Sequence, residues 1–118
     1  MTQEDKELLL IDISARLPYG VMVYDYDKEE TREMGLGTLH DIMFNELECK
    51  PYLRPMSSMT EEERKEYNEY LFHGASIGLM SNTETAYELI DWLNAHYFDY
   101  RGLIDKGLAL EALEGMYN

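Results

Sequence analysis

The sequence has a single cysteine, few basic residues and no long apolar run. Because Cys49 has no second cysteine to pair with, an intramolecular disulfide is excluded, and so is a zinc site built from several thiolates. No stretch approaches the roughly 20 apolar residues that cross a bilayer, and the N-terminus has neither a basic region nor a cleavage site. We therefore expect a cytoplasmic protein without a membrane partner, in which Cys49 is a buried structural thiol.

Basic residues are scarce throughout the chain. There are 10 lysines and arginines against 24 aspartates and glutamates, which gives a net charge of -14. Proteins that bind nucleic-acid backbones or anionic membranes derive much of their affinity from clustered cations. We therefore expect neither direct nucleic-acid binding nor binding to a membrane surface.

Two of the three prolines lie in the segment 49–59, which carries Lys50 and Arg54 but no acid. Proline fixes its own φ and biases the residue before it toward extended backbone, so Pro51 and Pro55 predict a stiff strand over 50–56. A stiff segment with two cations on an acidic protein is a candidate contact site.

The length of 118 residues predicts one domain, 1–118, that folds alone or as a small homo-oligomer. Thr2 caps a helix over 2–17, which Pro18 ends. Apolar residues then alternate, with Val21 and Val23 on one face of a strand. A polar turn over 27–32 leads to further strands over 36–39, 41–47 and 50–56.

Two capping boxes follow the strands. Thr60 and Glu63 predict a helix from 60 to about 72, and Ser81 with Glu84 predicts another that ends near 98 and packs on the sheet. The apolar residues of the segment 99–118 predict an ordered wrap over the core. The whole pattern predicts an α+β fold with an antiparallel meander of three or four strands. About three helices accompany it, one before the sheet and two after it.

Four segments carry a resemblance to a known family. They read A-R-L-P-Y-G-V at 15–21, K-P-Y-L-R-P-M-S-S-M-T-E-E-E at 50–63, D-W-L-N-A-H-Y-F-D-Y-R-G-L-I at 91–104 and G-L-A-L-E-A at 107–112. The chain resembles an uncharacterised family of short acidic proteins from gut Bacteroides-type genomes, often encoded in phage-like or mobile regions. The segments 25–48 and 70–82 match that pattern poorly. The resemblance implies a phage-related context and no activity, ligand or catalytic residue.

No complete catalytic or metal-binding set is visible in the sequence. His96 and Asp99 are three residues apart, with His40 or His73 as distant third ligands, but two ligands do not make a site. No serine lies in a nucleophile elbow, and the two glycines at 35 and 37 form only half of a dinucleotide fingerprint. The run 98–102 is either a recognition loop or a helix exit that plugs the core. We expect no cofactor, no metal and no enzymatic activity.

These observations favour a binding or adaptor module that contacts another protein. Its candidate surface combines cations and tyrosines: Arg16, Tyr24, Tyr26, Lys50, Tyr52 and Arg54. One alternative is an acidic mimic of nucleic acid that inhibits a host DNA-binding protein through the acids of 25–33 and 61–69. A second alternative is an enzyme whose site is assembled from residues distant in sequence.

Overall fold

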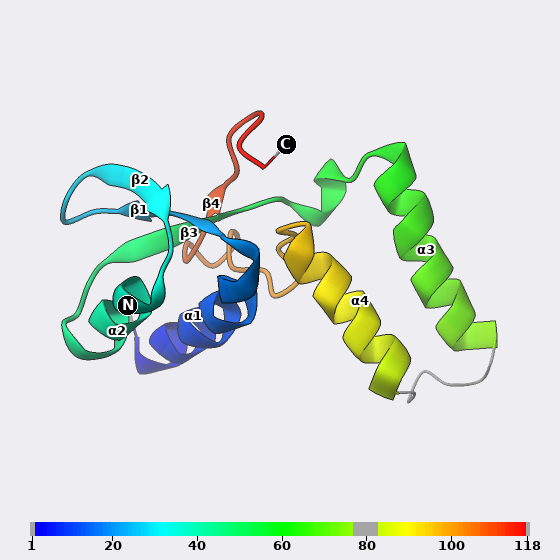
Figure 1. Cartoon of the computed structure of the whole chain (residues 1–118), viewed down its shortest axis with the longest axis horizontal. Coiled ribbons are helices and arrows are strands. Elements are labelled where there is room, and N and C mark those ends of the chain that lie inside the picture. Colours follow the sequence, from blue (N-terminus) through cyan, green and yellow to red (C-terminus); the bar gives the residue numbers. More distant parts are fainter. Residues whose placement is uncertain (1, 77–82, 118) are drawn as a thin grey trace.

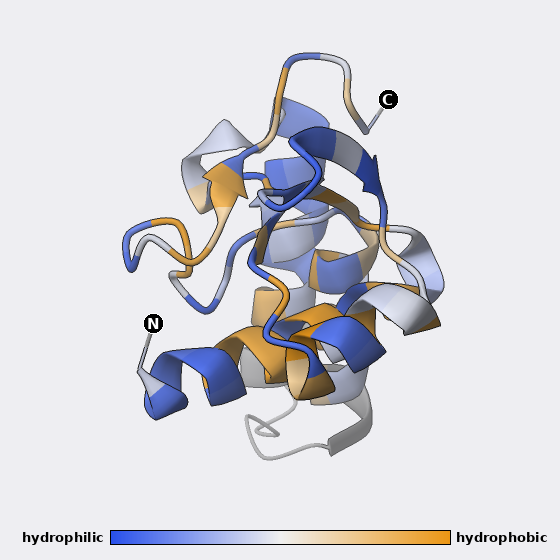
Figure 2. Cartoon of the chain, turned by 90° about the vertical axis from the view of Figure 1, so that its left-hand side faces the viewer, coloured by the Kyte–Doolittle hydropathy of each residue, from blue (hydrophilic) through white to orange (hydrophobic). Residues whose placement is uncertain are grey.

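A helix from Gln3 to Arg16, α1, opens the fold in this computed structural model, which describes residues 2–76 and 83–117. The predicted cap is confirmed, because Thr2 Oγ1 accepts the N–H of Asp5 at 3.1 Å and the Asp5 carboxylate accepts the N–H of Thr2. A 3-10 turn at Leu17–Tyr19, which contains Pro18, ends the helix. Figure 2 shows α1 changing from a hydrophilic first turn beside the N-terminus to a more hydrophobic middle.

Within the described residues the sheet has four strands, in the spatial order β2-β1-β3-β4 (Figure 1). The bounds are Met22–Asp25 for β1, Glu30–Glu33 for β2, Cys49–Leu53 for β3 and Leu110–Glu111 for β4. β1 pairs antiparallel with β2 and with β3, whereas β4 runs parallel to β3. The α+β class is confirmed. The purely antiparallel meander is wrong, because the segment 99–117, which we call the tail, brings β4 alongside β3 in the same direction.

The strands predicted over 36–39 and 41–47 are one helix, α2, from Leu36 to Phe44. Thr38 and Ile42 are the buried residues of this helix and lie four apart, which is the spacing of one helical face. Thr38 Oγ1 also accepts the N–H of Gly35, at 3.4 Å, just before the helix. The predicted turn over 27–32 is shorter than expected, since β2 already begins at Glu30.

Two helices follow β3: α3, Glu61–Ser76, and α4, Thr83–Ala95. The first capping box is confirmed by the Glu63 N–H on Thr60 Oγ1 at 3.1 Å and the Thr60 N–H on the Glu63 carboxylate at 2.9 Å. Ser81 of the second box lies outside the described residues. α4 ends before 98 because Tyr97 takes a left-handed φ of 62°.

The packing of α4 also differs from the prediction. α4 contacts mainly α3 and α1 rather than the sheet, and Figure 1 shows α3 and α4 as a helical hairpin beside the sheet. Among the α4 side chains that the structure describes, Trp92 and Leu93 are the buried apolar ones, whereas Ala86 and Ile90 are exposed. We call α3 and α4 the hairpin. None of the helices in the described ranges is both long and apolar enough to cross a membrane.

The described residues contain two apolar clusters. The body cluster lies among α1, α2, the sheet and the tail, and its completely buried members include Ile13, Val21, Val23, Leu53 and Leu103. The hairpin cluster consists of Trp92, Leu93 and Phe98, with partly buried residues of α3 and the segment before it packed around them. The predicted wrap of the segment after 98 over the core is confirmed, since Leu103 and Leu108 are buried and the Tyr117 hydroxyl donates to the Tyr52 carbonyl at 2.6 Å.

Candidate functional site

The six residues predicted to line one contact surface divide into an internal group and an open group. Arg16 is completely buried and Tyr52 is 7% exposed, so neither lines an open surface. Tyr52 lies under the tail and shares a hydrogen bond with Thr31 Oγ1 at 3.2 Å. For these two residues the prediction of an accessible surface is wrong, because each has partners inside the fold.

Arg16 belongs to a buried ionic cluster. Its Nε and Nη2 donate to the two oxygens of Asp12 at 2.8 and 3.0 Å, and Nη2 also donates to the Phe98 carbonyl at 2.7 Å. Arg101 adds a third bond to Asp12, at 2.7 Å. These bonds join α1 to the segment after α4, so Arg16 has a structural role.

Arg54 is also engaged internally, although it stays partly exposed. Its guanidinium donates to both oxygens of Glu63 at 2.6 and 2.7 Å and lies 4.2 Å above the Phe98 ring. The hydrogen bonds from Arg54, which outweigh the effect of burial, lower the pKa of Glu63 to about 2. The prediction of a free cationic segment is therefore wrong at Arg54, since its charge is paired at the start of α3.

The Arg54–Glu63 pair predicts a pH dependence of stability. The folded pKa of Glu63, about 2, is below its ordinary 4.5, so its contribution is present above pH 4.5 and is lost as the pH falls toward 2. We expect Glu63→Gln to lower the free energy of unfolding at pH 6 by about 1–2 kcal/mol, and by less near pH 2. Urea denaturation at several pH values measures this. Glu62→Gln removes the same charge one residue away, and an equal effect of both variants would contradict the assignment.

Tyr24, Tyr26 and Lys50 do come together on the face of the sheet opposite the buried Val21 and Val23. Antiparallel pairing places Tyr24 across from Lys50. The rings of Tyr24 and Tyr26 meet edge to face at 4.8 Å, and Lys50 Nζ lies 5.6 Å from the Tyr26 ring. Three of the six residues of the predicted surface thus lie together, but their side chains contact one another.

A more exposed apolar surface lies on α2, where the sequence pattern predicts strands. Leu36 is 72% exposed, Met43 45% and Phe44 68%, and the ring of His40 lies 5.0 Å from that of Phe44. The spacing i, i+4, i+7 and i+8 places these side chains on one side of the helix. We call Leu36, His40, Met43 and Phe44 the α2 stripe.

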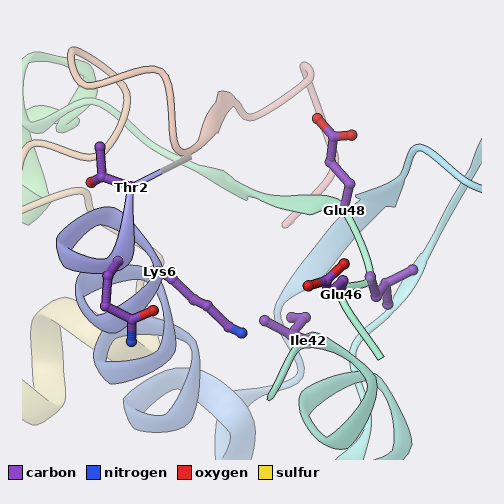
Figure 3. A pocket seen from close by; sticks show the side chains of 7 residues that line it. Thr2, Lys6, Ile42, Glu46 and Glu48 are labelled. Atoms are coloured by element: carbon purple, nitrogen blue, oxygen red, sulfur yellow. The ribbon is translucent and has the colours of Figure 1, made fainter. Parts of the chain in front are cut away.

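A cavity of about 400 Å³ lies between the start of α1 and the C-terminal end of α2, and none of the four stripe residues lines it. Its lining comes from the start of α1 and from the end of α2 with the loop after it: Thr2, Gln3, Lys6, Ile42, Glu46, Leu47 and Glu48. Figure 3 shows the Lys6 side chain reaching across from α1 toward Ile42 and Glu46. Lys6 Nζ also donates to the Met43 carbonyl at 3.4 Å, which links the cavity to the stripe. We call this cavity the α2 pocket.

His96 and Asp99 do not form a metal pair. His96 Nδ1 lies 2.8 Å from the Trp92 carbonyl, and the Asp99 carboxylate accepts the N–H groups of Leu103 and Ile104 at 2.8 and 2.9 Å. Among the residues that the structure describes, no three histidine, cysteine or acidic side chains gather as a metal site. Of the two readings of the run 98–102, the helix exit fits the structure, because Phe98 is completely buried.

Some carboxylates in each of the two acidic blocks proposed to mimic nucleic acid are paired with groups inside the fold. Burial opposes ionisation of Asp25, but the N–H groups of Lys28 and Asp27 and the Arg32 guanidinium outweigh it and lower its pKa. In the second block Glu63 pairs with Arg54, and Glu66 accepts the Trp92 indole N–H at 2.8 Å. These three carboxylates bind groups within the fold, so they are not free to form a row of charges that resembles a phosphate backbone.

Cys49 is 1% exposed, and burial raises the pKa of its thiol to about 11, so the expected structural thiol is confirmed.

The resemblance to short acidic proteins of gut bacterial genomes stays a prediction. Comparison of the chain with protein-family models, with curated proteins and with solved structures found no match.

Proposed function

We propose that this protein is a non-catalytic binding module whose contact surface for another protein is the α2 stripe. The observation that carries the proposal is the exposure of three large apolar side chains, Leu36, Met43 and Phe44, on one side of a nine-residue helix. Contiguous exposed apolar groups on a small acidic protein are costly in water, and such patches commonly mark interaction sites.

The structure of α2 supports this use. Ile42 anchors the helix in the body cluster, and Thr38 is also buried, so the helix is held firmly while its other side faces outward. Surfaces of leucine, methionine and phenylalanine adapt well to an opposing helix or groove. The stripe therefore has a rigid base and adaptable side chains, which suits recognition of a partner.

Site-specific photo-crosslinking tests the proposal. A photoreactive phenylalanine analogue at position 44, in cells that naturally encode the chain, is expected to yield a discrete conjugate with another protein. The additional changes Leu36→Ser and Met43→Ser should reduce the yield of that conjugate at least about fivefold, because they remove the apolar contacts beside the probe.

The matched control places the same analogue at Phe72, which is 75% exposed on α3. The same conjugate from both positions, or a yield at position 44 that Leu36→Ser and Met43→Ser do not alter, would contradict the proposal. A conjugate between two copies of the chain would show that the α2 stripe mediates self-association, and it would contradict a contact with another protein.

A further inference from the structure

We propose that the occupant of the α2 stripe is a basic amphipathic helix of the partner protein, with one lysine or arginine inserted into the α2 pocket. This inference rests on the proposed function and names the partner's chemistry. Its two parts are an apolar contact along α2 and an ionic contact at the end of α2.

Charge favours a basic partner over a second copy of the chain. Each copy carries a net charge of -14, so self-association brings two strongly anionic surfaces together. The carboxylates of Asp41, Glu46 and Glu48 are borne by α2 and the loop that follows it, and Glu46 and Glu48 are exposed. A positively charged occupant would be attracted by these carboxylates, and this attraction would speed its association with the α2 stripe.

The α2 pocket has the features that bind a long cationic side chain. Ile42 and Leu47 provide apolar contact for a methylene stem, while two carboxylates, Glu46 and Glu48, oppose one ammonium, that of Lys6. The pocket also lies at the C-terminal end of α2, where the helix dipole favours positive charge. The two carboxylates and the C-terminal end of α2 favour a cation. Among the described residues of the lining, Lys6 and the N-terminal turn of α1 oppose it, so Glu46 and Glu48 decide the preference.

The dimensions of the stripe indicate a helix of moderate length. Leu36 and Phe44 are separated by eight residues, which is about 12 Å along the helix axis. An opposing helix covers this distance with two to three turns, using apolar residues three and four apart. A basic residue one turn beyond the last apolar residue would then reach the α2 pocket.

Synthetic peptides test the inference directly. An 18-residue fluorescent peptide of leucine and lysine in an amphipathic helical pattern should bind the full chain in an anisotropy titration. A peptide with glutamate in place of lysine should not bind, and a scrambled leucine-lysine peptide should bind at least fivefold more weakly. Binding should weaken from 50 to 300 mM salt, because screening reduces the ionic part.

Matched variants locate the peptide. Glu46→Gln with Glu48→Gln should raise the Kd about five- to tenfold, whereas Lys6→Gln should lower it about two- to fivefold. The control pair is Glu69→Gln with Glu88→Gln, which removes the same charge from a groove of about 290 Å³ between the hairpin helices. That pair should change the Kd less than twofold. Circular dichroism of each variant confirms that it is folded.

The results separate the two proposals. Equal weakening by both pairs of glutamine substitutions, or equal binding of the scrambled peptide, means general attraction to an acidic protein and overturns the inference. If position 44 forms its conjugate but the leucine-lysine helix does not bind, the binding module stands and the basic helix is wrong. If position 44 forms no specific conjugate, the proposed function itself fails.

Discussion

Asp12→Ala is expected to lower the free energy of unfolding by about 3–5 kcal/mol, because it leaves the completely buried Arg16 guanidinium without its carboxylate. Both oxygens of Asp12 are engaged, one with Arg16 Nε and the other with Arg16 Nη2 and Arg101 Nη1. After the substitution, the Phe98 carbonyl continues to accept from Arg16 at 2.7 Å, but a carbonyl dipole does not neutralise a buried cation. Urea denaturation at pH 7 measures the loss.

The double variant Asp12→Leu with Arg16→Met is the control for this prediction. It removes both buried charges and replaces them with apolar side chains of similar volume, so it should be more stable than Asp12→Ala. Arg101 tolerates the change, because its side chain is 23% exposed and reaches water. If the double variant were less stable than Asp12→Ala, the loss would come from packing and not from an unpaired charge.

The caps were predictable from the sequence because their partners are three residues apart. Thr2 with Asp5 and Thr60 with Glu63 form their bonds within the first helical turn, and no distant contact is needed. The burial of Arg16 also had a local signal, since Asp12 precedes it by four residues on the same helix. That spacing was present in the sequence, but it does not say that the pair is enclosed.

The segment 36–47 shows where a local pattern fails. Ile42 and Phe44 alternate with Met43 and Asn45, which fits a strand, yet a short helix also places Ile42 inward and Phe44 outward. Gly37 lowers the helix propensity, and burial of Ile42 in the body cluster overrides that preference. Because the helix was missed, the α2 stripe was missed with it.

The candidate surface depended on contacts that sequence spacing does not reveal. Arg54 finds Glu63 nine residues away, across the 3-10 turn that leads into α3. The neighbourhood of Tyr24 and Lys50 follows from the register of β1 with β3. A free cation and a paired one look the same in a sequence, so the surface could be proposed but its accessibility could not be derived.

Phe98→Ala is expected to lower the free energy of unfolding by about 3–5 kcal/mol, because it opens a cavity between the hairpin and the sheet. Phe98 is completely buried, and its ring stacks on Trp92 with the centroids 5.7 Å apart. The neighbouring backbone extends β3, since the Arg54 N–H donates to the Tyr97 carbonyl at 2.7 Å and the Asp99 N–H to the Arg54 carbonyl at 2.8 Å. Loss of the ring therefore weakens the attachment of the hairpin.

Amide hydrogen exchange tests where that loss falls. In Phe98→Ala, the amides of α3 and α4 should lose more protection than those of α1, because the hairpin cluster depends on Phe98 and the body cluster has its own core. Phe72→Ala is the matched control: this phenylalanine is 75% exposed, so its removal should change stability by less than about 0.5 kcal/mol. Uniform loss of protection across α1, α3 and α4 would mean that the two clusters unfold as one cooperative unit.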